Sequence, residues 1–296
     1  MAVTPRALVI GANGQLGYDI VRALRGDGGW EVVPLTHAGI EITDPGTVAS
    51  VLQAHRPDVV INTAAYHAVD RNDQAAEFFR VNAVGVKILA EATRDAGGIL
   101  VHFSTDYVFD GSLGRAYHEG DAPNPVNTYG ISKLAGELLI RATTPRHYIL
   151  RVCGLYGVTG CRAKAGMNFV EIMLGKASRG EAIRVVTDQV VSPTYTVDVA
   201  EVLVRLLPTD RYGTYHAVNP GPCTWYEFAR DIFELSGMVG AVQVLPATSA
   251  EVYSSVRRPA NSALENRALR AAGLPDLRHR REALAAYLKE RGTRRA

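Results

Sequence analysis

Tyr129 and Lys133 form the pair of side chains best suited to chemistry in this sequence. They stand four residues apart, so a helix would place the phenol and the amine on one face, one turn from each other. A free phenol has a pKa of about 10 and is a poor acid–base catalyst near neutral pH. A neighbouring ammonium, with an oxidised nicotinamide, favours the phenolate and eases proton exchange with a carbonyl oxygen. The pair therefore predicts the reduction of a carbonyl group.

A third polar group, the hydroxyl of Thr105, lies in the segment Ser104 to Gly111. It could hydrogen-bond the substrate oxygen as negative charge develops there. Threonine also commonly satisfies backbone groups in a turn. The presence of Tyr129 and Lys133 later in the chain favours the catalytic interpretation, so we predict these three residues as catalytic.

The glycine-spaced turn from Gly11 to Gly17 follows an apolar run and precedes an amphipathic helix. Gly11 permits the tight turn, Gly14 lets the backbone approach a phosphate, and Gly17 allows close helix–strand packing. Backbone N–H groups and the amino end of the helix would then face a diphosphate, which predicts a dinucleotide site. The predicted contacts in this turn are Gly11, Asn13, Gly14, Gln15 and Leu16.

The end of the next apolar run bears on the choice of cofactor. An acidic residue there would hold the ribose 2′-hydroxyl of NAD and repel the 2′-phosphate of NADP. The chain instead has Thr36 and His37, of which the first can donate to phosphate and the second adds positive charge. This favours NADPH, with NADH tolerated. Ile42 is predicted to flank the adenine.

Small residues end the third apolar run, which reads Asn-Thr-Ala-Ala-Tyr from Asn62 to Tyr66. They make room for a flat ligand across the sheet, although ordinary helix–sheet packing would also explain them. We predict cofactor contacts from Ala64, Ala65 and Tyr66, and from Tyr129 and Lys133.

Apolar runs alternate with helix-period segments in the first half, which predicts an α/β fold with a doubly wound, Rossmann-like parallel sheet. The expected strands are 7–10, 31–35, 58–62, 99–104 and 148–152, and the expected helices are 15–25, 45–54, 74–95 and 129–142. After Tyr156 the sequence is richer in Pro and Gly, which is typical of a substrate lobe. We expect a nucleotide domain over 1–156 and a smaller, interleaved lobe over 157–296, with some segments returning to the first domain.

Composition narrows the functional classes. The 296 residues are 47% hydrophobic with a net charge of +2, and no basic stripe suggests a nucleic-acid partner. No segment has the roughly 20 apolar residues needed to cross a bilayer. The odd set Cys153, Cys161 and Cys223 suits reduced packing thiols in a cytoplasmic protein. The basic tail 291–296 is expected to be a solvated, frayed end.

Taken together, the motifs resemble the dTDP-4-dehydrorhamnose reductase family of extended short-chain dehydrogenases/reductases over nearly the whole chain. The segments that carry the resemblance are 11–17, 62–70 (NTAAYHAVD), 104–111 (STDYVFDG), 129–137 (YGISKLAGE), 168–170, 188–194 (DQVVSPT), 224–229 (TWYEFA) and 257–262 (RRPANS). The later segments are far more specific than the glycine turn or the Tyr/Lys pair.

The resemblance implies that NAD(P)H delivers hydride to C4 of dTDP-4-dehydro-L-rhamnose and that Tyr129 protonates the alkoxide. Lys133 would hold the nicotinamide ribose, and Thr105 would complete the catalytic set. The product would be dTDP-L-rhamnose, a precursor of cell-surface polysaccharide, made by a monomer or homodimer. Some relatives bind magnesium through carboxylates at a subunit contact; Asp19 stands near one such position, but a single acid predicts no metal.

Several side chains are candidates to hold the nucleotide sugar. Arg257 and Arg258 can present guanidinium groups to a diphosphate, or else remain solvated loop arginines. Thr105, Asp106, Asn168 and Gln189 complete the predicted substrate contacts. Trp225 is expected to anchor a helix in the core rather than to stack on thymine.

One departure from the family pattern leaves the sugar open. Many members have an Arg-x-x-Trp run whose indole lines the sugar site, whereas this chain reads Arg-Val-Cys-Gly from Arg151 to Gly154. A reductase of another dTDP-4-keto sugar, such as a dihydrostreptose precursor, is therefore an alternative. A non-catalytic NADP-binding regulatory subunit is a second alternative, which the retention of Thr105, Tyr129 and Lys133 disfavours.

Overall fold

The computed structural model describes residues 4–70, 72–160, 167–238, 242–252 and 256–295. A six-stranded sheet lies at its centre in the order β10-β5-β4-β3-β1-β2, and every pair of neighbours is parallel. Its strands are β1 (Arg6–Ile10), β2 (Glu31–Leu35), β3 (Val59–Asn62), β4 (Ile99–Thr105), β5 (His147–Val152) and β10 (Gly213–His216). The strand order reverses at β1, so the predicted doubly wound parallel sheet is confirmed.

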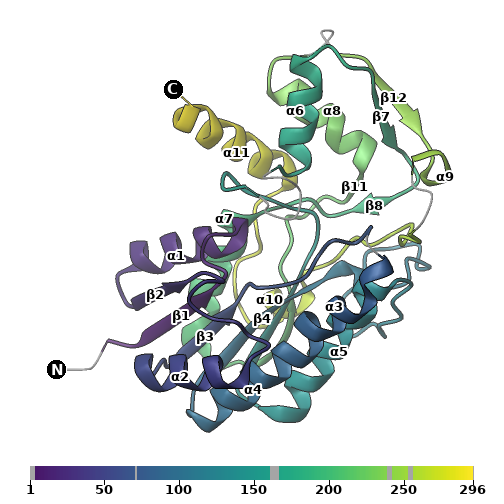
Figure 1. The fold of residues 1–296 in the computed structure, drawn as a ribbon. Coiled ribbons are helices and arrows are strands. Elements are labelled where there is room, and N and C mark those ends of the chain that lie inside the picture. Colours follow the sequence, from purple (N-terminus) through teal and green to yellow (C-terminus); the bar gives the residue numbers. More distant parts are fainter. Residues whose placement is uncertain (1–3, 71, 161–166, 239–241, 253–255, 296) are drawn as a thin grey trace.

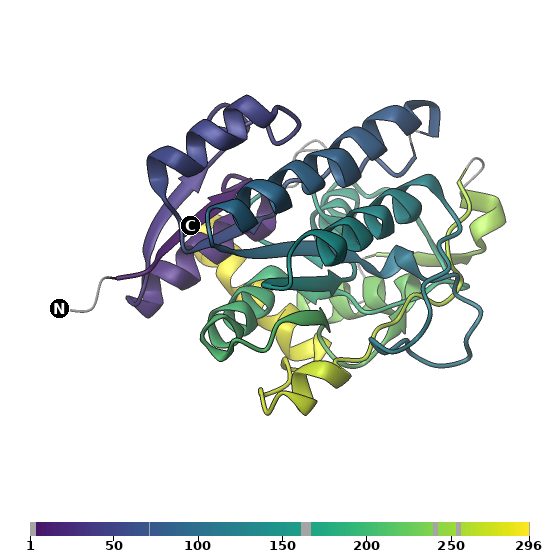
Figure 2. The same cartoon turned by 90° about the horizontal axis from the view of Figure 1, so that it is seen from below.

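Helices cover both faces of this sheet (Figures 1 and 2). One face packs against α1 (Gln15–Asp27), α7 (Thr196–Leu206) and α10 (Arg267–Ala271), and the other against α2 (Pro45–His55), α4 (Val86–Asp95) and α5 (Thr128–Thr143). The inner strands alternate their side chains between two apolar cores: Ala7 and Val9 face the first, whereas Leu8 and Ile10 face the second. Burial on both faces explains why β3, β4 and β5 read as apolar runs.

The sequence predicts one continuous helix over 74–95, whereas the structure has four consecutive helical elements there. These are η1 (Asn72–Gln74), α3 (Ala75–Phe79), the π-helical η2 (Arg80–Gly85) and α4. The wider turn lets the Asn82 amide point inward, where Nδ2 donates to the Ser132 hydroxyl at 3.0 Å and to Tyr66 O at 2.8 Å. Such π-turns are frequent at functional sites.

A smaller lobe lies above the carboxyl ends of the strands (Figure 1). Its elements are β6 (Leu155–Tyr156), α6 (Phe169–Ser178), β7 (Ile183–Val186), β8 (Val190–Val191), β9 (Thr194–Tyr195), β11 (Cys223–Thr224), α8 (Trp225–Leu235), β12 (Val244–Ala247), α9 (Ser249–Val252) and α11 (Arg280–Arg295). It has its own core, which includes Tyr156, Phe228, Ile232 and Tyr287. The short turns η3 (Asp106–Val108) and η5 (Leu207–Thr209) complete the described elements.

The chain passes between the two lobes more than once. After β9 it returns as α7, η5 and β10 to the central sheet, and after α9 it returns again as α10. A division of the chain at residue 156 stays a prediction.

The expectation of a frayed tail is wrong for residues 291–295, because α11 continues to Arg295. The Arg291 guanidinium donates to Glu171 of α6, and Arg294 donates to the Tyr18 hydroxyl of α1. These partners, distant in sequence, hold the last turn against both lobes.

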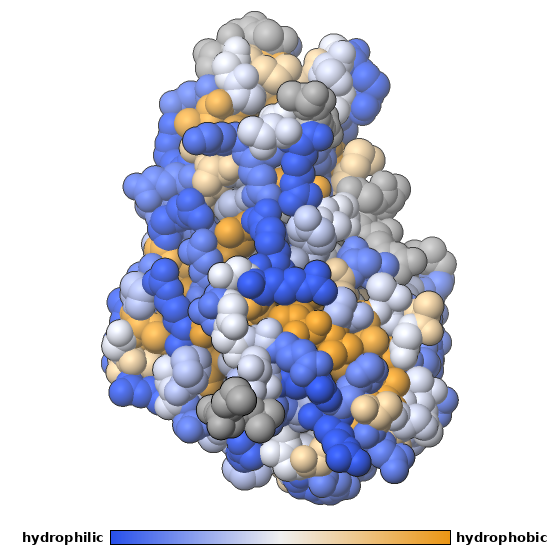
Figure 3. All heavy atoms as spheres, turned by 90° about the vertical axis from the view of Figure 1, so that its left-hand side faces the viewer, coloured by the Kyte–Doolittle hydropathy of each residue, from blue (hydrophilic) through white to orange (hydrophobic). Residues whose placement is uncertain are grey.

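Cys153 and Cys223 are buried free thiols, whereas Cys161 lies outside the described residues. Figure 3 shows hydrophilic and apolar residues interspersed over the side of the molecule that carries α1 and the edge strand β2. Within the described ranges, no helix has the length and apolar character needed to cross a membrane.

Candidate functional site

The start of α5 positions the Tyr129 phenol. The Asn127 side chain accepts from the Gly130 N–H at 2.9 Å, which caps the helix so that Tyr129 lies in its first turn. A Cβ atom at Gly130 would stand 2.1 Å from Tyr107 O, so only glycine lets the helix approach the segment after β4 this closely. The carboxyl end of β4 and the start of α5 therefore meet at this point.

Thr105, the last residue of β4, lies beside Tyr129 and hydrogen-bonds it. Its hydroxyl also donates to Asp106 Oδ1 at 2.9 Å and accepts from the Tyr107 N–H at 3.2 Å. Thr105 thus stabilises the turn and lies beside the phenol, and a hydrogen bond from Thr105 to a substrate oxygen stays a prediction.

Lys133, one turn after Tyr129, extends its side chain under the site and is only 1% exposed. Its Nζ atom lies 2.6 Å from Phe103 O and 3.1 Å from His102 Nε2. Burial lowers the pKa of Lys133 to about 7. Removal of the Tyr129 phenol from water raises its pKa. The hydrogen bond with Thr105 offsets part of this shift.

These directions describe the protein alone, and the expectation that an ammonium together with an oxidised nicotinamide favours the phenolate stays a prediction. In the protein alone, desolvation is the largest cause of both pKa shifts. The phenol therefore keeps its proton, which is the form that an acid needs in order to protonate a substrate oxygen.

Asp106 lies behind Thr105 and is 4% exposed. Its Oδ1 atom accepts from Thr105, and its Oδ2 atom accepts from the Cys153 thiol at 3.1 Å. Burial raises the pKa of this carboxyl. A contact between Asp106 and a sugar hydroxyl stays a prediction.

The glycine turn has the geometry of a diphosphate cradle. Gly11 has φ = +80°, and a Cβ atom there would stand 2.5 Å from the Thr63 hydroxyl oxygen. A Cβ atom at Gly17 would stand 2.3 Å from Gly11 O, so the helix and the turn touch through backbone. No side chain caps the N-terminus of α1 at Gly14. Backbone N–H groups beside the reversal of strand order therefore fit a dinucleotide diphosphate.

The neighbours of this turn have distinct positions. Asn13 is exposed, Leu16 is buried in the core, and the Gln15 side chain accepts from the Gly157 N–H at 3.0 Å. The side-chain oxygen of Gln15 is therefore engaged within the protein, and a contact between Gln15 and a cofactor stays a prediction. Thr36 is half-buried and His37 is exposed after β2, with His37 Nε2 3.7 Å from Glu41 Oε2.

The remaining predicted cofactor residues lie on the same edge of the sheet. Ile42 is buried against Gly85. The Ala64 N–H donates to Asn62 Oδ1 at 3.0 Å, and the Tyr66 N–H donates to Asn82 Oδ1 at 2.9 Å. Ala65 lies half-buried between them. The loop after β3 is therefore held in place by two inward-facing asparagine amides.

The predicted substrate residues are partly engaged within the protein. The Asn168 side chain caps α6 through the Glu171 N–H and donates to Gly157 O, and the Gln189 amide donates to Ser249 Oγ at 2.8 Å. Arg257 is exposed, and Arg258 pairs with Asp70. Substrate contacts from these four residues stay predictions.

Trp225 has a role beyond the expected helix anchor. Its ring packs on Phe169 at 4.6 Å between centroids, as an anchor would. It also covers Gly154: a Cβ atom at position 154 would stand 3.2 Å from Cη2 of the indole. The departure from the Arg-x-x-Trp pattern therefore coincides with an indole supplied by α8.

His102 and the buried pair of Glu137 and Arg151 were missed by the sequence reasoning. His102 is 1% exposed, and Arg151 Nη2 lies 2.7 Å from Glu137 Oε2. A polar residue inside an apolar strand is the feature that could have revealed His102. Arg151 shows the same feature, since it is a charged residue inside the buried strand β5, but its partner Glu137 lies on α5, so no local pattern reveals the pair.

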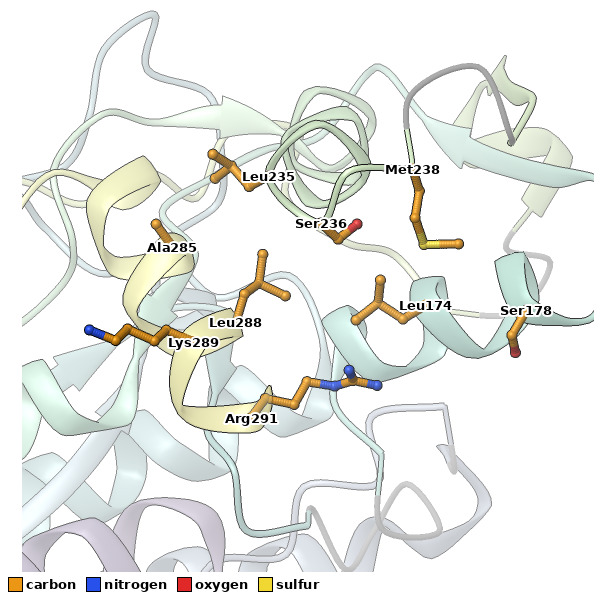
Figure 4. Close-up of a pocket in the computed structure, with 9 residues that line it drawn as sticks. All are labelled: Leu174, Ser178, Leu235, Ser236, Met238, Ala285, Leu288, Lys289 and Arg291. Atoms are coloured by element: carbon orange, nitrogen blue, oxygen red, sulfur yellow. The ribbon is translucent and has the colours of Figure 1, made fainter. Parts of the chain in front are cut away.

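A groove of about 590 Å³ lies elsewhere, in the second lobe between α6, α8 and α11 (Figure 4). Its lining is mostly apolar, with Lys289 and Arg291 at the α11 side, and it includes none of the predicted catalytic residues. Within the described part of the chain, no cluster of three or more His, Cys, Asp or Glu residues could hold a metal ion.

Comparison with known proteins agrees with this geometry. The family model described as RmlD substrate binding domain matches residues 5–292. The chain is 41% identical to the spore coat polysaccharide biosynthesis protein SpsK of Bacillus subtilis, with 97% of this chain and 98% of that protein covered. It is 39% identical to a dTDP-4-dehydrorhamnose reductase of Streptomyces griseus, with 95% and 92% covered.

A solved structure of a relative has the same fold over almost the whole chain. The crystal structure of dTDP-4-dehydrorhamnose reductase from Bacillus anthracis in complex with NADP superimposes with a TM-score of 0.91 at 36% identity, covering 97% of this chain and 100% of the other.

Proposed function

The chain belongs to the RmlD substrate binding domain family, and we propose that it reduces the C4 ketone of dTDP-4-dehydro-L-rhamnose to dTDP-L-rhamnose with NADPH. The observation that carries this proposal is the meeting of Thr105, Tyr129 and Lys133 at the end of β4, on the same sheet edge as the diphosphate cradle. The names of the Streptomyces griseus and Bacillus anthracis relatives support the substrate, and the bound NADP of the latter supports the cofactor.

Three residues of this chain have separate roles in the proposed reaction. Bound NADPH supplies a hydride to C4 of the sugar. Tyr129 donates its proton to the oxygen that becomes the 4-hydroxyl, and solvent later replaces that proton. Thr105 hydrogen-bonds the same oxygen and so stabilises the negative charge that develops on it. Lys133 holds the nicotinamide ribose and so orients the ring against the sugar.

The nucleotide half of the substrate needs positive charge. Arg257 and Arg258 lie in a segment that packs beside the start of α5, since Asn127 Nδ2 donates to Arg257 O at 3.0 Å. Their guanidinium groups would bind the diphosphate of the dTDP moiety. Asp70 already pairs with Arg258, so a bound diphosphate would compete with that carboxylate.

The protein would work in the cytoplasm as a monomer or homodimer, and its product would serve cell-surface polysaccharide. The name of the Bacillus subtilis relative, a spore coat polysaccharide biosynthesis protein, supports this use.

The test follows absorbance at 340 nm with purified protein, enzymatically made dTDP-4-dehydro-L-rhamnose, and NADPH or NADH. We expect turnover with both cofactors and a higher kcat/KM for NADPH. Tyr129→Phe should lower kcat by about 10²–10⁴-fold, because it removes the proton donor. Its Kd for NADPH, measured by fluorescence, should stay within about twofold of the parent value, a difference of under about 0.5 kcal/mol.

Two outcomes would overturn the proposal. NADPH binding without turnover of this sugar would favour a regulatory protein, or another dTDP-4-keto sugar if that sugar were reduced instead. Full activity in Tyr129→Phe would remove the phenol from the mechanism.

A further inference from the structure

The amine of Lys133 is buried among a small set of polar atoms. Phe103 O accepts one of its hydrogens at 2.6 Å, and its other close partner is His102 Nε2 at 3.1 Å. A hydrogen bond between two nitrogens contains a single proton, so either the amine donates to the imidazole or the imidazole donates to the amine. The tautomer of His102 decides between these arrangements.

The opposite side of the imidazole faces Asn62. His102 Nδ1 lies 3.2 Å from Asn62 Nδ2, and Asn62 Oδ1 accepts from the Ala64 N–H at 3.0 Å. An amide flip would place the Asn62 amino group against that N–H and leave two donors facing each other. The backbone of Ala64 therefore fixes Asn62 Nδ2 as a donor toward the ring.

Because Asn62 donates to Nδ1, this nitrogen must carry the lone pair, and the neutral imidazole must carry its proton on Nε2. That proton points at Lys133 and needs an acceptor, which an ammonium cannot be. From this we infer that the Asn62–His102 pair holds Lys133 as a neutral amine in the protein without cofactor. Asn62 and His102 would thus set the charge of Lys133.

The charges around Lys133 are consistent with this assignment. On α5, Glu137 favours the charged amine, but that carboxylate is already paired with Arg151 of β5 and with Arg141. Tyr129 lies on the same helix face and keeps its proton, and Asp106 lies on the far side of Thr105. Burial lowers the pKa of both Lys133 and His102, so it favours the neutral amine in the same way as the hydrogen bonds do.

A neutral Lys133 suits a reductase because it leaves the Tyr129 phenol protonated. The inference rests on the proposed function only in placing Lys133 at the cofactor ribose. Binding of the cofactor would then be linked to proton uptake by Lys133, since an ammonium donates more hydrogen bonds to hydroxyls than an amine does.

The test is an NMR titration of the free protein with lysine labelled by ¹³C at the ε-carbon. The chain has only five lysines, at 87, 133, 164, 176 and 289, and loss of one signal in Lys133→Arg assigns the resonance. We expect Lys133 to titrate with a midpoint near pH 7. A free lysine amine has an ordinary pKa of about 10.4, so a midpoint near pH 7 would stand well apart from that value.

Two variants test whether Asn62 and His102 set the titration midpoint of Lys133. Asn62→Asp presents only acceptors, so His102 must move its proton to Nδ1, Nε2 becomes an acceptor, and Lys133 should remain an ammonium to about pH 9 or above. His102→Gln adds no charge and can turn its carbonyl oxygen to Nζ, so it should raise the midpoint by at least about one pH unit. His147→Gln, at a histidine bonded to Thr144 O instead, should leave the midpoint unchanged.

An ammonium at Lys133 in the parent protein at pH 9 would overturn the inference. So would unchanged midpoints in Asn62→Asp and His102→Gln; if the first variant fails to fold, the second alone decides. Since the titration needs neither sugar nor cofactor, it separates the two proposals. A protein without reductase activity but with a midpoint near pH 7 refutes the function and supports the inference.

Discussion

The indole of Trp225 lies over Gly154, with Cη2 only 3.2 Å from where a Cβ atom at position 154 would stand. Gly154 also has φ = +52°, in the left-handed region that favours glycine. Glycine is therefore required here both by the backbone and by its neighbour, and α8 contributes to the end of β5 an indole that the local sequence lacks.

Gly154→Ala should lower the free energy of unfolding more than the matched variant Gly180→Ala. Gly180 has φ = +65° but no atom within 4 Å of its Cβ position, so both variants share the left-handed strain of about 1–2 kcal/mol. Contact with Trp225 should add roughly 1–3 kcal/mol at position 154 alone. Urea unfolding measures the difference, and equal losses would show that Trp225 moves aside freely.

The buried ion pair between Glu137 and Arg151 should be a strong determinant of stability. Glu137→Ala leaves the Arg151 guanidinium buried without its partner and should lower the free energy of unfolding by roughly 3–5 kcal/mol. Glu91→Ala removes an exposed pair with Lys87 on α4 and should change it by under about 0.5 kcal/mol. Comparable losses in chemical denaturation would contradict the burial argument.

Asp19 should make stability depend on pH in the direction opposite to that of a typical carboxylate. Burial raises its pKa above the ordinary 3.8, although the Thr196 hydroxyl and Arg22 oppose the shift. The unfolded chain therefore releases this proton at lower pH than the folded protein, and stability falls as the pH rises from 3.8 through the raised value. An asparagine side chain at this position has no such proton to lose.

Asp19→Asn should accordingly be more stable than the parent at pH 7, and the advantage should shrink as the pH falls toward 4. Unfolding curves at several pH values measure this trend. An advantage that grows at low pH would mean that the folded protein holds Asp19 as a favourable carboxylate.

His37→Asp should change the cofactor preference. The new carboxylate would stand at the end of β2, where it repels a 2′-phosphate and can hold a ribose hydroxyl. We expect the Kd for NADPH to rise by about tenfold or more, while the Kd for NADH stays constant or falls. Fluorescence titration measures both, and NADH is the internal control. Equal weakening of the two cofactors would point to a disturbed loop instead.

Five strands of the sheet were predictable because their signals are local, whereas the edge strand β10 was not predicted. Strands buried on both faces give continuous apolar runs, and the glycine turn and the Tyr129/Lys133 spacing each occupy a few consecutive residues. Expected and observed ends of these strands differ by one residue at most.

The second lobe gave no such pattern. Several of its strands, such as β6, β8, β9 and β11, are two residues long, which is too short for any periodicity to show. The structure of the candidate site also depends on contacts between residues that are distant in sequence. Asn62 and His102 are 40 positions apart, and only the pairing of β3 with β4 reveals that their side chains meet. The ordered tail has the same origin, since its partners lie on α6 and α1.

The position of β10 in the second half of the chain also affects where the chain can be divided. This strand pairs with β5 from Tyr148 to Arg151, but it lies more than 60 residues after β5 in the chain. A fragment ending at Tyr156 would expose the unpaired backbone of β5, whose six residues are all buried in the whole chain. Such an apolar open edge is a template for self-association, so the nucleotide domain cut out at that point should aggregate.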